Sequence, residues 1–478
     1  MNMLNLKKID HNNPDFDELY RMLSELKSFL NEDANFADES WAENFKIIID
    51  FQESDGSFKL LDSYRVPSDA SVDFCYMPTY ICTAILMKAF MTDSKAFSSD
   101  EESSLFYGLR RSCARNLSGH GFEGLLGQID ALKIFMGAGL NEFMDLYNDF
   151  CSEFSEMIEG FVSRFNDMEV NGDFLGSWGE SYESDIRLIN EYFRHRHIFV
   201  YGTLMDGECN HHFFSNSTCL GRTYVEGYEM YDVGWYPAIV SGNGMVIGEL
   251  YRVDLDDIPA IDMLEGEGDL YAKTCECIQD SDGNSLFAFI YVYLGDCDGL
   301  ERISSWKDYV WYVSYGSNML NERFMCYIEG GAYGKSRYRE ACDDTSHPVL
   351  VRTVSIPYEM YFANRSGSWE NGGVAFLDTS RKGNSLGVAY LITEEQFDHV
   401  AAQENGGRYP EPGFNWYEDI IDLGEMDGFK VRTITNNIPR HPNAPCSSYR
   451  EVLAEGIRQN WPQKSSREID DYLNGCIR

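Results

Sequence analysis

The sequence predicts an α+β multidomain protein in which a helical region of about 194 residues precedes two β-rich domains. Apolar residues at helical spacing occupy the first region. From residue 197 onward, short apolar runs alternate with turn residues, a pattern typical of strands. A strand that breaks at a glycine occurs twice, as Tyr201-Gly202-Thr203-Leu204-Met205 and as Tyr315-Gly316-Ser317-Asn318-Met319. At 478 residues, the chain has room for roughly three domains of ~150 residues.

The first region is expected to be helical throughout. Asn13 and Pro14 form a cap and first-turn pair ahead of an apolar face made of Leu19, Met22, Leu23, Leu26, Phe29 and Leu30. Further helices are expected at 41–51, 78–90, 122–136 and 141–165. The histidine of Gly119-His120-Gly121 is either catalytic or ligand-binding, or it caps or packs a turn, and the turn is favoured because no nucleophile, phosphate loop or ligand cluster accompanies it. A polar stretch at 169–184 and a last short helix place a boundary near residue 194.

Strands are expected next at 239–240, 248–253, 273–278 and 286–294, and after a linker at 296–306 they resume at 349–354, 359–362, 373–377, 387–392 and 430–434. Each β-rich domain also contains a short helix, at 258–264 with Asp257 as its cap and at 394–402 with Thr393 as its cap. A helix is expected at 447–461. The predicted domains are therefore 1–194, 195–300 and 305–478.

Composition narrows the possible partners. Asp and Glu number 78 against 39 Lys and Arg, a formal charge of −39, which disfavours nucleic acid and anionic membranes. No apolar run approaches the ~18 residues that cross a bilayer, and the start lacks a secretory signal, so a cytoplasmic protein is expected. The 13 cysteines show no paired metal spacing. Cys275 and Cys277 suit one face of a strand, and no metal or cofactor is predicted.

The repeated turn can bind a ligand. A strand that breaks at Gly202 or Gly316 leaves consecutive backbone N–H groups without ladder partners, and the glycine lets a ligand approach the main chain. Such a row of amides can hold a carboxylate or a carbonyl oxygen. An ordinary strand-ending turn is the alternative, which two copies in comparable settings make less attractive.

Each β-rich domain also has a helix that ends in glutamate. Glu265 ends the first and precedes Gly266 and Tyr271, and Glu404 ends the second and precedes Gly406-Gly407. The helix dipole disfavours an acid at this end. Partial burial would raise the pKa of such a carboxyl, as a general base near neutral pH requires. The alternative is that both are surface acids in an acidic chain.

These motifs, in this order, resemble two related cyclotransferase groups. Residues 197–295 are similar to gamma-glutamylamine cyclotransferases in Tyr201-Gly202-Thr203-Leu204, Gly234-Trp235-Tyr236-Pro237, Gly248-Glu249-Leu250-Tyr251 and Asp262-x-x-Glu265-Gly266 with Leu270-Tyr271. Residues 310–461 resemble gamma-glutamyl cyclotransferases in Tyr315-Gly316-Ser317-Asn318-Met319, Gly372-Gly373-Val374-Ala375, Gly387-Val388-Ala389-Tyr390 and Gln403-Glu404. The second copy departs from the family in having Asn405 after its glutamate and a long insert between Tyr327 and Val349.

The resemblance implies a small mixed β-barrel in each domain and a metal-free, cofactor-free reaction that cyclises a gamma-glutamyl amide, peptide or isopeptide to 5-oxoproline and releases the amine. It implies Glu265 and Glu404 as the acid/base residues. It implies a substrate-binding set made of Tyr201, Gly202, Thr203, Leu204, Tyr271, Tyr315, Gly316, Ser317, Asn318 and Gly373.

Two other functions stay open. The pockets could bind a gamma-glutamyl or small acidic ligand without turnover, in a regulatory protein. Alternatively, the same fold could cleave an amide by hydrolysis. The leaving amine and the role of the helical region do not follow from the sequence.

Overall fold

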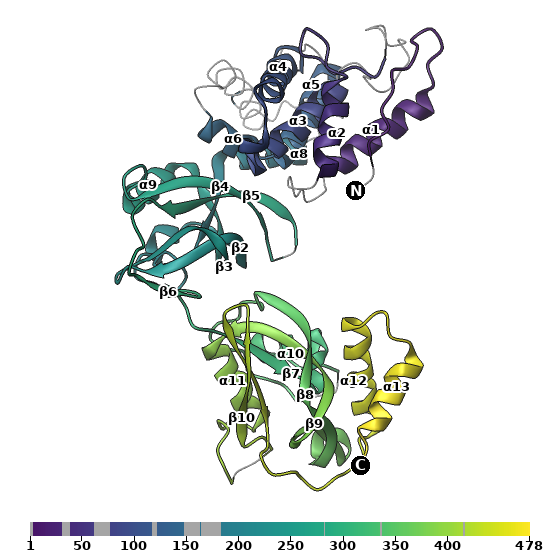
Figure 1. The fold of residues 1–478 in the computed structure, drawn as a ribbon, viewed down its shortest axis with the longest axis vertical. Coiled ribbons are helices and arrows are strands. Elements are labelled where there is room, and N and C mark those ends of the chain that lie inside the picture. The colour runs from purple at the N-terminus through teal and green to yellow at the C-terminus, as the bar shows by residue number, and fades with distance from the viewer. Residues whose placement is uncertain are drawn as a thin grey trace. The chain divides into compact units, whose positions relative to one another are not determined.

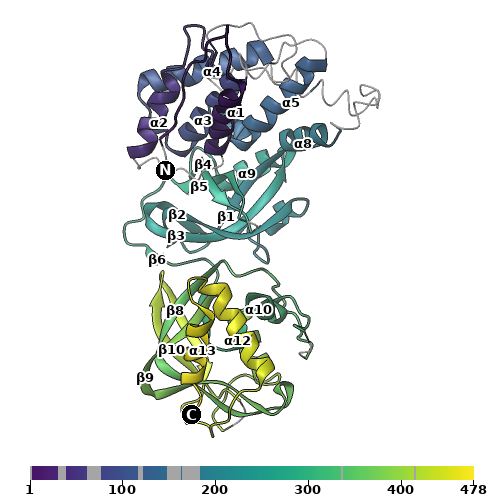
Figure 2. The same ribbon diagram turned by 90° about the vertical axis from the view of Figure 1, so that its right-hand side faces the viewer.

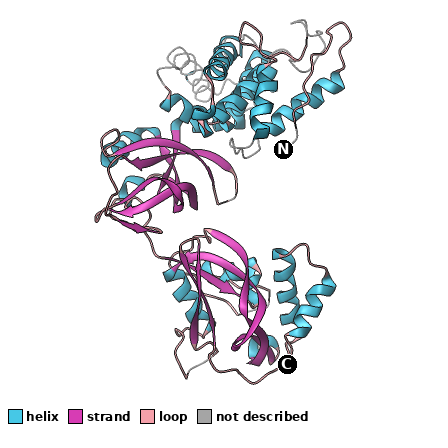
Figure 3. Ribbon diagram, viewed as in Figure 1, coloured by secondary structure: helices cyan, strands magenta, loops and turns pink. Residues whose placement is uncertain are grey.

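The computed structural model describes residues 3–30, 39–61, 77–116, 122–147, 163, 183–281, 283–334, 337–413 and 416–478. The chain forms two compact units. One comprises Met1–Val200, Leu204–Leu220 and Leu250–Asp296, and the other comprises Tyr201–Thr203, Gly221–Glu249 and Cys297–Arg478. Helices dominate the N-terminal part of the chain and two groups of strands follow (Figure 1, Figure 3), which confirms the predicted fold class. The boundaries at 194 and 300–305 stay predictions.

The N-terminal helices pack around a shared apolar core. They are α1 (Phe16–Leu30), α2 (Glu39–Ile49), α3 (Met77–Thr92), α4 (Ser99–Asn116), α5 (Phe122–Gly137), α6 (Leu140–Leu146) and α8 (Glu183–Arg194). In α1, Leu19, Met22, Leu23, Leu26 and Phe29 are buried, as their spacing predicts. Helix α3 is buried along nearly its whole length, which fits an apolar helix at the centre of a bundle.

Sequence reasoning missed one helix in this region. Helix α4 carries three acidic residues in its first turn and was not predicted. The helix expected at 141–165 corresponds to α6 up to Leu146, after which Tyr147 ends α6. Most of the remainder, at 148–162 and 164–165, lies outside the described residues, as does Gly119-His120-Gly121. In the described ranges, no helix is both long enough and apolar enough to cross a bilayer.

The helices rest on the first sheet through contacts within one compact unit. Phe287 of that sheet belongs to the helical core. A Cβ at Gly139, which has a φ of 82°, would lie 2.5 Å from the Phe287 ring, so only glycine fits there. Arg196 donates to Asp145 at 2.6 Å. Figure 2 shows β4 and β5 alongside these helices.

The first sheet is mixed, with strand order β4-β5-β1-β3-β2-β6. Its strands are β1 (His195–Val200), β2 (Thr218–Asp232), β3 (Pro237–Asp254), β4 (Tyr271–Gln279), β5 (Ser285–Tyr293) and β6 (Glu301–Ile303). Strands β1 and β5 are parallel, and β4 and β5 are antiparallel. The runs predicted at 239–240 and 248–253 are one strand, β3, and the predicted linker contains β6, which pairs with β2.

The second sheet has the order β10-β11-β7-β9-β8. Its strands are β7 (Tyr309–Ser314), β8 (Leu350–Ser366), β9 (Gly372–Thr393), β10 (Asp419–Met426) and β11 (Phe429–Thr435). The α-helices described in this part are α10 (Asn321–Ile328), α11 (Glu394–Glu404), α12 (Ser447–Asn460) and α13 (Ser466–Gly475). Strands β7 and β11 are parallel, whereas β10 and β11 are antiparallel. Strands β8 and β9 each unite two predicted runs, and β10, α10 and α13 were not predicted.

The two sheets repeat one topology. In chain order, β1 to β5 correspond to β7 to β11, and each set has the spatial order fourth, fifth, first, third, second. In both sheets the first and fifth strands form a parallel pair. The helices between the third and fourth strands, α9 (Ile258–Glu265) and α11 (Glu394–Glu404), therefore occupy equivalent places. The tandem arrangement suggested by the sequence is present in the strand order.

The two helices begin differently. Thr393 caps α11 as predicted, through a capping box with Gln396. Asp257 occupies the N-cap position of α9 as predicted, but its side chain makes no cap hydrogen bond. A short 3₁₀ turn at Leu255–Asp257 precedes α9, and Asp254 caps that turn by accepting from the Asp256 N–H at 3.0 Å.

Candidate active site

The turn after β7 is held from several sides. All six residues of β7 are buried, and the chain then turns at Gly316 into a 3₁₀ turn at Ser317–Met319. The Tyr315 hydroxyl donates to the Ile434 carbonyl at 2.7 Å, and the Tyr390 hydroxyl donates to the Asn318 carbonyl at 2.8 Å. A Cβ at Gly316 would lie 3.3 Å from the Tyr449 hydroxyl. These contacts fix the backbone at the site where a ligand was expected.

Glu404 contacts this turn from the end of helix α11. It is the last residue of α11, where the helix dipole disfavours a negative charge. The Asn318 side-chain amide offsets this by donating from Nδ2 to Glu404 Oε1 at 2.8 Å. Burial, and then the nearby Glu404 carboxylate, raise the pKa of Tyr312 and of Tyr327 well above the usual range. Both phenols therefore keep their protons near neutral pH beside this carboxylate.

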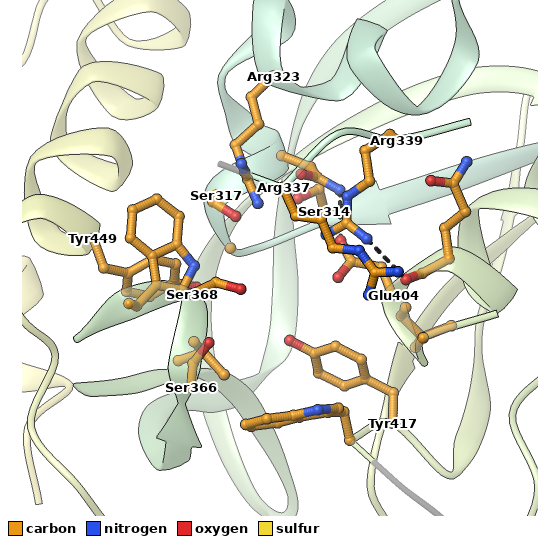
Figure 4. Close-up of a pocket in the computed structure, with 18 of the residues that line it drawn as sticks. Ser314, Ser317, Arg323, Arg337, Arg339, Ser366, Ser368, Glu404, Tyr417 and Tyr449 are labelled. Carbon is orange, nitrogen blue, oxygen red and sulfur yellow. Dashed lines mark hydrogen bonds between the residues drawn. The ribbon is translucent and has the colours of Figure 1, made fainter. Parts of the chain in front are cut away.

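A cavity of about 370 Å³ contains both the turn and Glu404. Figure 4 shows the labelled side chains around it, with Arg323, Arg337 and Arg339 on the same side as Ser317 and with Tyr417 and Tyr449 opposite one another. Of the predicted site residues, the cavity is lined by Tyr315, Gly316, Ser317, Asn318 and Glu404. Gly373 does not line it. Its N–H donates to Ala444, and a Cβ there would lie 1.9 Å from the Asn443 carbonyl oxygen.

Residues that the sequence did not single out complete this cavity. Tyr449 comes from α12, and its hydroxyl accepts the Ala375 N–H at 3.1 Å. Tyr417 is fixed by Asn405, which accepts the Tyr417 N–H at 2.9 Å and donates to its carbonyl at 2.6 Å. The departure at Asn405 therefore fastens one wall of the cavity. The insert noted between Tyr327 and Val349 supplies Arg337 and Arg339.

In the first sheet, Glu265 is the last residue of α9 and is half-buried. Gly266 follows with a φ of 62°, a left-handed conformation that glycine adopts readily at a helix end. Burial raises the pKa of the Glu265 carboxyl to about 7. The carboxyl can therefore gain or lose a proton near neutral pH, which is the property that a general acid/base needs.

Helix α9 is anchored one turn before Glu265. The Lys273 ammonium donates to both Asp262 oxygens, at 2.9 and 2.8 Å, and the Tyr291 hydroxyl donates to Asp262 Oδ1 at 2.6 Å. Charge-assisted hydrogen bonds of this kind are among the stronger ones in proteins. Asp262 therefore ties the end of α9 to β4 and β5, and thereby limits where Glu265 can lie.

The other predicted residues of this domain have defined surroundings. Tyr201, Leu204 and Tyr271 are buried, and Thr203 is half-buried. A Cβ at Gly202 would lie 2.5 Å from the Pro237 ring, so the turn after β1 requires glycine for close packing. Tyr271 packs edge-on against Tyr293, with ring centroids 5.5 Å apart.

Fold and site together define a class of protein: a tandem of small mixed sheets, each with a glutamate at the end of the helix between its third and fourth strands. The family described as "Gamma-glutamyl cyclotransferase, AIG2-like" matches residues 198–310. The chain is 40% identical over 113 residues to the gamma-glutamylcyclotransferase family protein YtfP of Escherichia coli, which covers 23% of this chain and 96% of that protein. The chain belongs to the gamma-glutamylcyclotransferase family.

Two further similar proteins cover different shares of this chain. The gamma-L-glutamyl-butirosin B gamma-glutamyl cyclotransferase of Niallia circulans is 38% identical over 120 residues, which is 23% of this chain and 76% of that protein. The crystal structure of YkqA from Bacillus subtilis is 19% identical, covers 59% of this chain and 99% of that chain, and has a TM-score of 0.24. Apart from the first two residues of β7, the second sheet lies beyond the residues that match the family, so its relationship to the first sheet is carried by the shared strand order.

Proposed function

We propose that the protein cyclises a gamma-glutamyl amide, peptide or isopeptide to 5-oxoproline and releases the amine. The observation that carries this proposal is the cavity of the second sheet, in which Glu404 is hydrogen-bonded to Asn318 of the glycine turn. The equivalent position of Glu265 at the end of α9 extends the proposal to the first sheet. Membership of the cyclotransferase family supports it.

In this proposal, the two glycine turns hold the glutamyl end of the substrate. The glutamyl carboxylate or carbonyl would be bound by the backbone of residues 315–318 in the second site and of residues 201–204 in the first, because rows of backbone amides favour negative oxygens. Tyr271 would complete the first pocket. Gly373 would act on the second pocket indirectly, since its close packing against Asn443 sets the path of β9.

The reaction balances without a cofactor. Glu265 or Glu404 takes a proton from the substrate's α-ammonium group, and the freed nitrogen attacks the γ-carbonyl carbon of the same molecule. The new C–N bond closes the five-membered ring and the amide C–N bond breaks. Two protons leave the attacking nitrogen in all, and both end on the departing amine, with the glutamate carrying them. The lactam keeps one N–H.

Catalysis of this kind asks little of the protein beyond positioning and proton transfer. Holding a reactive conformer can remove several kcal/mol from the barrier of an intramolecular reaction. A placed acid/base group contributes typically ~10²–10⁴-fold. A pKa of about 7 for Glu265 matches this role, because neither protonation state dominates near neutral pH. The neutral phenols of Tyr312 and Tyr327 would keep the surroundings of Glu404 free of further negative charge.

The test is to incubate the full chain with a panel of gamma-glutamyl compounds and to detect products by mass spectrometry. Cyclisation gives 5-oxoproline and free amine in equal amounts. Free glutamate in place of 5-oxoproline would mean hydrolysis of the same bond. Binding without any product would mean a ligand-binding protein. Either of these outcomes would overturn the proposal.

A further inference from the structure

Three arginines line the cavity of the second sheet. Arg323 belongs to α10 and is buried, whereas Arg337 and Arg339 come from the insert that follows α10. Arg339 is half-buried and Arg337 is exposed. Glu404 is the only carboxylate among the described lining residues. The cavity is therefore positive, in a chain whose formal charge is −39.

Among the described residues, no carboxylate forms an ion pair with these guanidinium groups. Across the described ranges, none of Arg323, Arg337 and Arg339 forms an ion pair with a carboxylate. Other arginines of this domain do so, for example Arg432 with Glu394 at 2.7 Å and Arg450 with Asp470 at 3.0 Å. Acidic residues are abundant in this chain, so three unpaired arginines around one cavity indicate an anion that is supplied from outside.

Two of the three are already held in place. The Arg323 guanidinium lies over the Trp369 ring, 5.3 Å from its centroid, and its Nε is buried without a hydrogen-bond partner among the described atoms. The Arg339 guanidinium lies 4.4 Å from the Tyr327 centroid and donates from Nη1 to the Gln403 carbonyl at 3.0 Å. Stacking fixes the plane of a guanidinium while leaving N–H groups for a carboxylate.

We propose that the second site takes gamma-glutamyl substrates whose leaving amine is an acidic amino acid or peptide with at least two carboxylates, and that Arg337 and Arg339 select it. This inference rests on the proposed cyclotransferase function. The glutamyl end occupies the glycine turn, so the arginines are left for the departing group. One carboxylate engages one guanidinium in a bidentate pair, and three guanidiniums therefore call for more than one carboxylate. The volume, about 370 Å³, lies within the ~300–1,000 Å³ range of small-molecule sites.

The test compares gamma-glutamyl-glutamate with gamma-glutamyl-glutamine, which have the same shape and differ by one negative charge. The full chain carries Glu265→Gln, so that turnover comes from the second site. We expect kcat/KM for gamma-glutamyl-glutamate to be at least about tenfold higher, since hydrogen bonds between charged groups are worth about that much or more. The preference is expected to weaken as salt rises.

The double substitution Arg337→Gln and Arg339→Gln is expected to remove this preference, mainly by raising KM for gamma-glutamyl-glutamate. Arg467→Gln is the matched control. It replaces one exposed arginine of α13 by the same neutral residue, away from the cavity, and is expected to leave the preference intact. Equal kcat/KM for the two substrates in the parent protein, or a preference that survives the double substitution, would overturn the inference.

Calorimetric binding of the same two compounds separates this inference from the proposed function. If no compound yields 5-oxoproline, tighter binding of gamma-glutamyl-glutamate that is lost in the Arg337→Gln, Arg339→Gln protein still supports an acidic ligand at this site. Equal binding of both compounds overturns it. Loss of turnover alone would count only against the cyclotransferase reaction.

Discussion

The Asn318 side chain donates a hydrogen bond from Nδ2 to Glu404 Oε1 at 2.8 Å, across 86 residues of sequence. This contact joins the turn after β7 to the end of α11. It satisfies one oxygen of the Glu404 carboxylate and thereby helps to orient it toward the turn. The Asn318 carbonyl is itself fixed by the Tyr390 hydroxyl, so the amide is held in place from the main chain.

Replacing Asn318 by alanine is expected to lower kcat of the second site by about 10²-fold, because a catalytic group displaced by about 1 Å can lose that much. The KM should change less, since the backbone of the turn remains. The measurement is 5-oxoproline release by the full chain carrying Glu265→Gln. Asn321→Ala, at an exposed position three residues on, is the control and should retain the parent rate. Parent activity in Asn318→Ala would show that this contact does not position Glu404.

The first site should show a pH profile set by Glu265. Burial raises the pKa of this carboxyl to about 7, and the base must be ionised to accept a proton. In the Glu404→Gln protein, kcat/KM is therefore expected to fall about tenfold for each pH unit below about 7. A rate that stays constant down to pH 5.5 would contradict this assignment, because kcat/KM reports groups of the free enzyme.

Stability should depend on the same carboxyl. Its pKa is about 7 in the folded chain against an ordinary value of 4.5, so the folded state binds more protons between these two pH values. The free energy of unfolding therefore falls as pH rises through this window and stays lower above it. Glu265→Gln removes this loss. The difference in free energy of unfolding between the Glu265→Gln protein and the unchanged protein should therefore be more favourable to the variant at pH 8 than at pH 4.5, by at most about 3 kcal/mol.

Glu142 provides the matched comparison. It is buried in α6, and burial raises the pKa of its carboxyl to about 7 as well. Urea unfolding at pH 4.5 and pH 8 should show the same direction of change for Glu142→Gln as for Glu265→Gln. Only Glu265→Gln should also lose first-site activity, measured in the Glu404→Gln protein. If both variants lost 5-oxoproline release equally, a general effect of burying an acid would explain the result better than catalysis.

Asn405 should matter for the cavity wall. It makes two hydrogen bonds to the Tyr417 backbone and is buried. Asn405→Ala breaks both and is expected to destabilise the protein by about 1–3 kcal/mol. The KM of the second site should rise, because Tyr417 lines the cavity. Urea unfolding and initial rates measure the two effects, with exposed Asn437→Ala as the control. Unchanged stability would mean that Tyr417 is held by other contacts.

Local patterns predicted the elements that lie nearest to the candidate site. The sequence alone predicted the two elements that form the cavity. One is strand β7 with the glycine that follows it, and the other is the helix that Thr393 caps and Glu404 ends. The same holds for Gly266 after Glu265, because helix ends with a following glycine have recognisable sequences. Whether these residues act in catalysis stays a prediction.

Contacts between elements far apart in the chain could not be predicted from local sequence patterns. Strands β8 and β9 extend through polar stretches and were predicted as separate pieces, since their outer ends lack apolar alternation. The contribution of Tyr449 depends on where α12 packs. Arg337 and Arg339 gave one signal, two arginines close together in an acidic chain, but nothing local placed them beside Glu404. Asp257 lies at the N-cap position of α9 without a capping hydrogen bond, and the 3₁₀ turn before α9, which the sequence did not reveal, is capped by Asp254.

The most direct measurement compares 5-oxoproline release by the unchanged protein, Glu265→Gln, Glu404→Gln and the double variant, with an active gamma-glutamyl substrate for each site. Each single variant should retain the activity of the other site, and the double variant should lose about 10²–10⁴-fold. Arg467→Gln controls for handling and should match the unchanged protein. Release by the double variant at the unchanged rate would contradict the assignment of both glutamates as the acid/base residues.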